Sequence, residues 1–136
     1  MLVEDVMSRA LVTIAPAETL RAAFDLLLKN RIRHLPVVDG SALVGIVTDR
    51  DVKRATPSVL SGIDRGEYDH VLETTKVGQV MTRDPVTVTP KTGLKAAVEI
   101  FLTRRVGALP VVDDGRLVGI LSDTDVMRVA FDLLPG

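Results

Sequence analysis

The sequence has no cysteine and no tryptophan, and it has one tyrosine and three phenylalanines among 136 residues. Without cysteine there are no disulfides, no thiolate metal ligands and no cysteine nucleophile. Aromatic residues make up 3% of the chain, which argues against a platform on which nucleic-acid bases stack. The formal net charge is -1, so no general field attracts nucleic acid or an anionic membrane. We therefore expect neither as a partner.

Long apolar runs are also missing, because no stretch approaches the ~20 residues of a membrane-spanning helix. The N-terminal residues 1–7 are too short and too acidic to form a signal peptide. We expect a soluble, cytoplasmic protein. With 46% hydrophobic residues and few rings, its core should consist of Val, Leu, Ile and Ala.

What the sequence does contain is an internal duplication. Residues 34–52 return as residues 108–126, at an offset of 74 positions and without a gap. The match extends to VMSR at 6–9 and VMTR at 80–83. Since the whole chain has the length of one domain, the copies should be halves of one compact module. We predict repeat 1 at residues 1–55, a connector at 56–76 and repeat 2 at 77–136.

Each repeat has the pattern strand, helix, strand, strand, helix. In repeat 1 the run 11–14 predicts a strand that ends before Pro16, and the apolar stripe of residues 20–28 predicts a helix with Thr19 as N-cap. Runs 35–38 and 43–48 flank a short turn, which is typical of a hairpin, and a helix should follow from Asp49 to about Ala55. The fold class is α/β (α+β), with two β-α-β-β-α repeats related by a pseudo-twofold axis.

The connector contains many turn-forming and charged residues, among them Ser61 and Gly62. Its length favours an ordered crossover over a free linker, and Val71 and Leu72 could anchor it to the body. Gly45 and Gly119 fall inside predicted strands, where a close approach of another backbone segment is a sufficient reason for glycine.

The motif Thr48-x-x-Asp51, repeated as Ser122-x-x-Asp125, lies where a strand passes into a helix. A capping box explains this spacing without any function, because the hydroxyl and the carboxylate satisfy unpaired N–H groups of the first turn. The same position also suits a ligand, since a helix N-terminus attracts phosphate and a carboxylate accepts hydrogen bonds from a ribose diol. The two roles are compatible.

Two copies of LPVVD followed by G-I-hydrophobic-[T/S]-D-x-D-V, at residues 35–52 and 109–126, resemble a pair of CBS (cystathionine β-synthase) domains of the stand-alone bacterial or archaeal type. The resemblance covers nearly the whole chain. It implies a cleft between paired repeats that binds an adenosine-containing ligand such as AMP, ADP, ATP or S-adenosylmethionine.

By that resemblance, Asp51 and Asp125 hold the ribose, while Thr48 and Ser122 lie beside the ribose and phosphate. The adenine would contact a segment that serves the Asp of the opposite repeat. One cleft would thus combine Asp51 with Thr82, Pro85, Val86 and Thr87, and the other would combine Asp125 with Ser8, Leu11, Val12 and Thr13. Without a ligand, these segments are simply an entry loop and a buried strand.

The two copies differ in the residues that could reach phosphates. Repeat 1 has Arg33, His34, Arg50 and Lys53, and the aligned residues of repeat 2 are Gly107, Ala108, Thr124 and Met127. Charge-assisted bonds to phosphate are among the stronger polar contacts. The Asp51 cleft should therefore prefer phosphorylated ligands, and the Asp125 cleft should take a less anionic adenosyl ligand or stay empty. Alternatively, Arg50 and Lys53 are ordinary solvated helix residues.

No catalytic grouping emerges from the sequence, and its two histidines, His34 and His70, have no second ligand at metal-binding spacing. We expect a sensory or regulatory module, not an enzyme, without metal or cofactor beyond the regulatory nucleotide. By resemblance it should form a homodimer and act on an effector protein. The alternative is a scaffold or dimerisation module with vestigial ligand sites.

Overall fold

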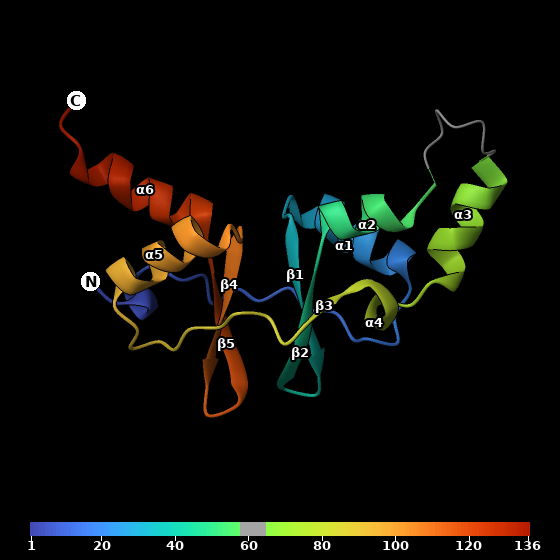
Figure 1. The fold of residues 1–136 in the computed structure, drawn as a ribbon, viewed down its shortest axis with the longest axis horizontal. Helices are drawn as coiled ribbons and strands as arrows, with labels where there is room; N and C mark the ends of the chain where they lie inside the picture. Colours follow the sequence, from blue (N-terminus) through green and yellow to red (C-terminus); the bar gives the residue numbers. More distant parts are fainter. Residues whose placement is uncertain (58–64) are drawn as a thin grey trace. The chain divides into compact units, whose positions relative to one another are not determined.

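The computed structural model describes residues 1–57 and 65–136 (Figure 1). It contains two compact units: unit 1 consists of residues 1–11 and 85–136, and unit 2 of residues 12–84. In chain order the elements are the 3₁₀ helix η1 (Val3–Asp5), α1 (Leu20–Asn30), β1 (His34–Asp39), β2 (Ala42–Thr48), α2 (Asp49–Ala55), α3 (Arg65–Thr74), α4 (Val77–Val80), β3 (Thr82–Arg83), α5 (Leu94–Arg104), β4 (Ala108–Asp113), β5 (Arg116–Ser122) and α6 (Asp123–Leu133). Within the described part of the chain, no helix has the length and apolarity to cross a membrane.

Each unit is built on one antiparallel hairpin, as predicted. In unit 2, β1 pairs with β2 from His34 opposite Thr48 to Asp39 opposite Ala42. In unit 1, β4 pairs with β5 in the equivalent register. The turns need left-handed backbone, which Gly40 adopts with φ 63° and Gly115 with φ 79°. Both hairpins also carry an irregularity in register between the two valines of LPVV.

The helix that precedes each hairpin covers it with one apolar face. In α1 the side chains of Leu20, Ala23 and Leu27 are buried, and the Thr19 hydroxyl accepts the N–H of Ala22 at 3.2 Å, which confirms the predicted N-cap. The predicted stripe was too wide, because Leu28 is 62% exposed. At 100° per residue, Leu28 lies at the edge of the face that Leu20 and Leu27 define.

The strand predicted at residues 11–14 is reduced to one bridge residue. Ile14 donates to the Pro36 carbonyl at 3.1 Å and accepts from the Val38 N–H at 2.9 Å. On one side the parallel ladder would next need an N–H from Pro36, and on the other an N–H from Pro16, and proline has none. Val88 makes the same single bridge in unit 1, between Pro110 and Pro90. Prolines on both sides therefore stop each strand.

The connector contains a helix that the sequence analysis did not predict. Residues 65–74 form α3, whose Leu72 is 1% exposed and belongs to the core of unit 2, which confirms the anchor. Arg21 on α1 binds Asp69 at 3.1 Å and also Glu73, and the hydrogen bond from Glu73 raises the pKa of the guanidinium. The turn signals Ser61 and Gly62 lie outside the described residues.

The segment that leads into each sequence copy packs on the hairpin of the other copy. In unit 2, Thr82 and Arg83 of β3 pair with Ile46 and Gly45 of β2. In unit 1, Ser8 and Ile120 exchange two backbone hydrogen bonds of 2.9 and 3.0 Å. Compact units and sequence copies thus differ in their N-terminal segments.

Glycine in the second strand permits this approach. A Cβ built on Gly45 would lie 2.6 Å from Met81 Sδ and 2.8 Å from the Thr82 carbonyl oxygen. On Gly119 it would lie 2.6 Å from Met7 Sδ and 3.1 Å from the Ser8 oxygen. These distances are shorter than a carbon can maintain, so the explanation of both glycines by close backbone approach is confirmed.

We expect Gly45→Ala to lower the free energy of unfolding by about 1–3 kcal/mol, because the backbone at Thr82 must move away from β2. Gly93→Ala is the control: no atom lies within 4 Å of its added Cβ, and its φ of -62° suits alanine. The control should cost less than about 1 kcal/mol. Urea unfolding measures both, and equal costs would contradict the role given to Gly45.

Candidate functional site

Both T/S-x-x-D motifs lie where the second strand of a hairpin passes directly into a helix. In unit 2 the Thr48 hydroxyl accepts the N–H of Asp51 at 3.1 Å, and Asp51 Oδ2 accepts the N–H of Thr48 at 2.9 Å. Ser122 and Asp125 form the same two hydrogen bonds in unit 1, at 3.1 and 2.9 Å. The expected capping box is therefore confirmed in both copies.

Capping uses only one oxygen of the Asp51 carboxylate. Within the described residues, Oδ1 of Asp51 takes part in no hydrogen bond, and the residue is half-buried. The bond to the Thr48 N–H fixes the orientation of the group, and the positive end of the α2 dipole favours its charge. The second oxygen can accept a hydrogen bond from a ligand hydroxyl without loss of the cap.

The carboxylate of Asp125 has an additional neighbour. Arg128 Nη1 lies 3.9 Å from Asp125 Oδ1, and the two side chains are 77% and 17% exposed. The sequence analysis did not single out Arg128, although positions i and i+3 of a helix are neighbours, so the D-x-x-R spacing was a usable signal.

A hollow of about 360 Å³ opens beside this pair, within unit 1. Its walls combine residues of the N-terminal segment with residues of α6: Met1, Asp5, Val6, Asp125, Arg128, Val129, Asp132 and Leu133. A volume of this size can hold part of a small ligand. Three of the lining side chains are carboxylates and one is a guanidinium.

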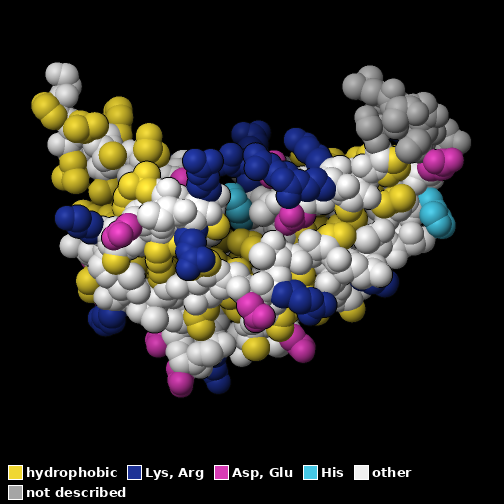
Figure 2. All heavy atoms as spheres, in the orientation of Figure 1, with side chains coloured by type: hydrophobic (Ala, Val, Ile, Leu, Met, Phe, Trp, Pro, Cys, Tyr) yellow, Lys and Arg dark blue, Asp and Glu magenta, His cyan; other side chains and the backbone are white. Residues whose placement is uncertain are grey.

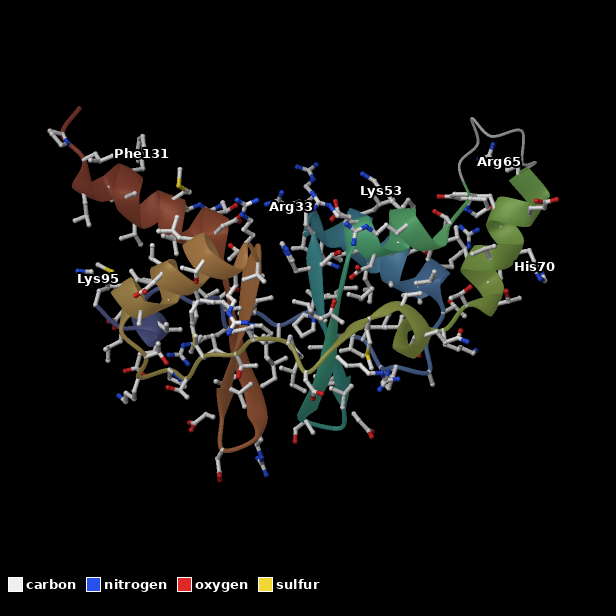
Figure 3. All side chains as sticks on the ribbon, in the orientation of Figure 1. Arg33, Lys53, Arg65, His70, Lys95 and Phe131 are labelled. Carbon is white, nitrogen blue, oxygen red and sulfur yellow. The ribbon has the colours of Figure 1, made fainter. Side chains whose placement is uncertain are left out.

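Basic residues surround the N-terminus of α2. The N–H of Asp49 donates to the Arg33 carbonyl at 3.1 Å, and His34 lies opposite Thr48 in the hairpin. These contacts bring the start of β1 next to the first turn of α2, where the Arg50 side chain is exposed. Figure 3 labels Arg33 at the start of β1 and Lys53 on α2. The structure thus brings together the predicted phosphate-side residues of unit 2.

Unit 1 has the same backbone with small neutral side chains. Asp123 donates to the Gly107 carbonyl at 3.0 Å, and Ala108 lies opposite Ser122. The Thr124 side chain is exposed at the position of Arg50, and Met127 is exposed at the position of Lys53. The asymmetry in charge is therefore a difference between equivalent positions.

The predicted adenine segments are divided between the units. Thr82, which is exposed, shares unit 2 with Asp51, and the half-buried Ser8 and Leu11 share unit 1 with Asp125. The chain passes from one unit to the other after Leu11 and after Asp84. The remaining segment residues belong to the unit that does not hold their predicted Asp: Pro85, Val86 and Thr87 to unit 1, and Val12 and Thr13 to unit 2.

No three His, Cys, Asp or Glu side chains of the described ranges gather as metal ligands. Arg33 and His34, by contrast, take part in further polar interactions. The arrangement at each helix start is that of a site for polar, uncharged or anionic groups of a ligand.

Comparison with known proteins gives a family. The family model described as CBS domain matches residues 3–58 and 77–132. A CBS domain-containing protein from Dictyostelium discoideum is 36% identical over 135 residues, which cover 98% of this chain and 93% of that protein. The chain spans less than half the length of several other relatives, some of which bear the names of enzymes. In those relatives the CBS pair is an attached part.

Two solved structures resemble the chain over nearly its full length. CBSX2 in complex with AMP is 30% identical, with a TM-score of 0.82 and coverage of 98% of this chain and 99% of that one. The CBS domain pair of protein MJ0100, in complex with 5′-methylthioadenosine and S-adenosyl-L-methionine, is 28% identical, with a TM-score of 0.80 and 97% coverage of both. These neighbours are CBS-pair modules of mixed α and β structure that bind adenosine-containing compounds.

Without ligand, Thr48→Ala should lower the free energy of unfolding by about 1 kcal/mol, because the Asp51 N–H loses its acceptor. Ser122→Ala should cost about the same, since its hydrogen bonds have the same lengths. Thr48→Ser keeps the hydroxyl and is the control. Chemical unfolding of the ligand-free protein measures all three, and a Thr48→Ala variant as stable as the parent would show that the cap contributes nothing.

Proposed function

This chain belongs to the CBS domain family, and we propose that it is a non-catalytic regulatory module that binds an adenine nucleotide or a related adenosyl compound. The observation that carries this proposal is the pair of oriented carboxylates, Asp51 and Asp125. Each is fixed by a backbone N–H at the start of a helix. The AMP, methylthioadenosine and S-adenosylmethionine held by the two structural neighbours support the ligand class.

In the proposed site, the ribose diol donates to the carboxylate of Asp51 and of Asp125. Thr48 and Ser122 lie at the adjacent N-cap, next to N–H groups that attract a phosphate. Adenine contacts the segment assigned to each cleft, with Thr82, Pro85, Val86 and Thr87 serving Asp51, and Ser8, Leu11, Val12 and Thr13 serving Asp125. Each cleft then takes residues from both units.

The two sites should differ in ligand. Arg33, His34 and Arg50 stand around the start of α2, where a phosphorylated ligand gains charge-assisted hydrogen bonds. At α6 the equivalent positions are Gly107, Ala108 and Thr124. Phosphorylated adenosine therefore binds at Asp51, and a less anionic adenosyl compound binds at Asp125. ATP, ADP and AMP compete for the first site, and S-adenosylmethionine suits the second.

The proposed mechanism of regulation is a shift of population. A ligand that contacts residues of both units favours one arrangement of the pair, and an effector protein or a second copy of the chain responds to that arrangement. We include the homodimer in this proposal. The competing function, a scaffold with vestigial sites, predicts the same fold and the same caps but no saturable ligand.

Thermal unfolding in the presence of ATP, ADP, AMP, S-adenosylmethionine and NAD separates the two functions, because a ligand that binds only the folded state raises its stability with concentration. We expect saturable stabilisation by a phosphorylated adenosine. Asp51→Asn should weaken it by about ten- to a hundredfold in Kd, since one carboxylate acceptor for the diol is lost. Asparagine keeps an oxygen for the Thr48 N–H, so the cap is preserved.

Asp49→Asn is the control, because Asp49 lies on the same turn but bonds only to the neighbouring Arg50 N–H. It should leave the Kd within about twofold. No stabilisation by any of the five ligands at millimolar concentration would favour the scaffold. Loss of ATP binding in Asp125→Asn, with binding intact in Asp51→Asn, would reverse the assignment of the two sites.

A further inference from the structure

The C-terminal half of α6 exposes large apolar side chains. Met127 is 68% exposed, Phe131 78% and Leu133 72%, and Leu134, which ends the helix, is 69% exposed. From residue 131 to 136 every residue is exposed. Figure 2 shows hydrophobic side chains gathered over this end of the chain, and Figure 3 shows Phe131 projecting from the helix.

The fold does not require this apolar surface. Val126 and Val129, on the other side of α6, already pack on the core of unit 1. In unit 2 the equivalent helix α2 ends at Ala55, and Lys53 and Pro57 occupy the positions of Met127 and Phe131. A unit of this kind therefore forms without the stripe. A helical end with no buried residue and four exposed apolar side chains is typical of a contact surface.

Two charges beside the stripe indicate what covers it. Arg128 and Asp132 are one helical turn apart on the flank of Met127 and Phe131. When two such helices cross antiparallel about residue 129 or 130, Arg128 of each copy faces Asp132 of the other. Met127 of each copy then faces Phe131 of the other, a contact that suits thioether and ring. The surface is complementary to itself, as a twofold interface requires.

We propose that the C-terminal half of α6 packs antiparallel against α6 of a second copy of this chain. The inference rests on the homodimer included in the proposed function, and it is independent of nucleotide binding. Eight large side chains, four from each copy, reach the order of 1,200 Å² at about 150 Å² each, the lower end of stable interfaces. Adjacent side chains at the rim of the crossing add to this area.

Sedimentation equilibrium of the full chain tests the interface. The parent should form a dimer at micromolar concentration, and Phe131→Glu should raise the dimer Kd by about a hundredfold or more, because a charge is then buried against its own copy. Leu102→Glu is the matched control: Leu102 lies on α5 of the same unit and is 76% exposed. It should keep the dimer. Circular dichroism and ligand-induced stabilisation should show that Phe131→Glu remains folded.

A charge exchange tests the antiparallel geometry. Arg128→Asp alone and Asp132→Arg alone each place like charges opposite one another, and each should weaken its own dimer by about tenfold. A mixture of the two variants restores both opposite-charge pairs, so a heterodimer should form with near-parental affinity. A purely structural role of either residue cannot produce this rescue.

Three outcomes would overturn the proposal: a parent that is monomeric at about 100 μM, a Phe131→Glu dimer as tight as the parent's, or a mixture that fails to form the heterodimer. Each is distinguishable from failure of the nucleotide proposal, which is measured on the same samples by ligand-induced stabilisation.

Discussion

In each unit, a backbone segment lies so close to the second hairpin strand that only glycine fits beneath it. At Gly45 the segment is β3, and at Gly119 it is the residues around Ser8. The contact is made by backbone hydrogen bonds, so its specificity comes from register and from the missing Cβ. Because each segment precedes the opposite sequence copy, neither copy contains a complete unit in its own contiguous residues. Separate expression of one copy would leave the hairpin edge of its unit unpaired.

The capping boxes make stability and binding depend on the same atoms. Asp51 and Asp125 each give one oxygen to the backbone and keep one outside the cap. A carboxylate held in this way loses little rotamer freedom when a ligand binds, so less of the binding energy is spent on ordering it. The same economy explains why an alanine substitution is a poor test of ligand contact, since it removes the cap together with the ligand oxygen.

Much of the fold follows from local sequence signals. Hairpins, caps and the strand-to-helix junctions depend on residues close in sequence, and Thr19, Gly40 and Thr48 mark them directly. The strand at residues 11–14 failed because β propensity counts side chains, while the ladder depends on N–H groups that Pro16 and Pro36 lack. Helix α3 was missed because Gly66 and its charges resemble a turn, whereas buried Leu72 and the Arg21 ion pairs stabilise it from outside the segment.

The candidate site was less accessible to sequence reasoning alone. Spacing located the junctions but could not choose between cap and ligand site, and the ribose role of Asp51 came from family resemblance. The exchange of segments between units was also hidden, because a repeat with constant offset says nothing about which copy a segment packs on. Arg128 could have been found by helical spacing, but its meaning depends on the hollow beside Asp125.

The differences between the two copies are concentrated on one element, the helix after the hairpin. Its first turn is the same in both, since the cap depends on Thr48 or Ser122 and the Asp three residues later. Beyond that turn the sequences separate: α2 is short and exposes Arg50 and Lys53, whereas α6 continues to Leu133 and exposes Met127 and Phe131. A charged surface suits an anionic ligand and an apolar one suits a protein. Duplication therefore supplied two equivalent helices, of which one could specialise toward phosphate and the other toward a second copy while both kept the same cap.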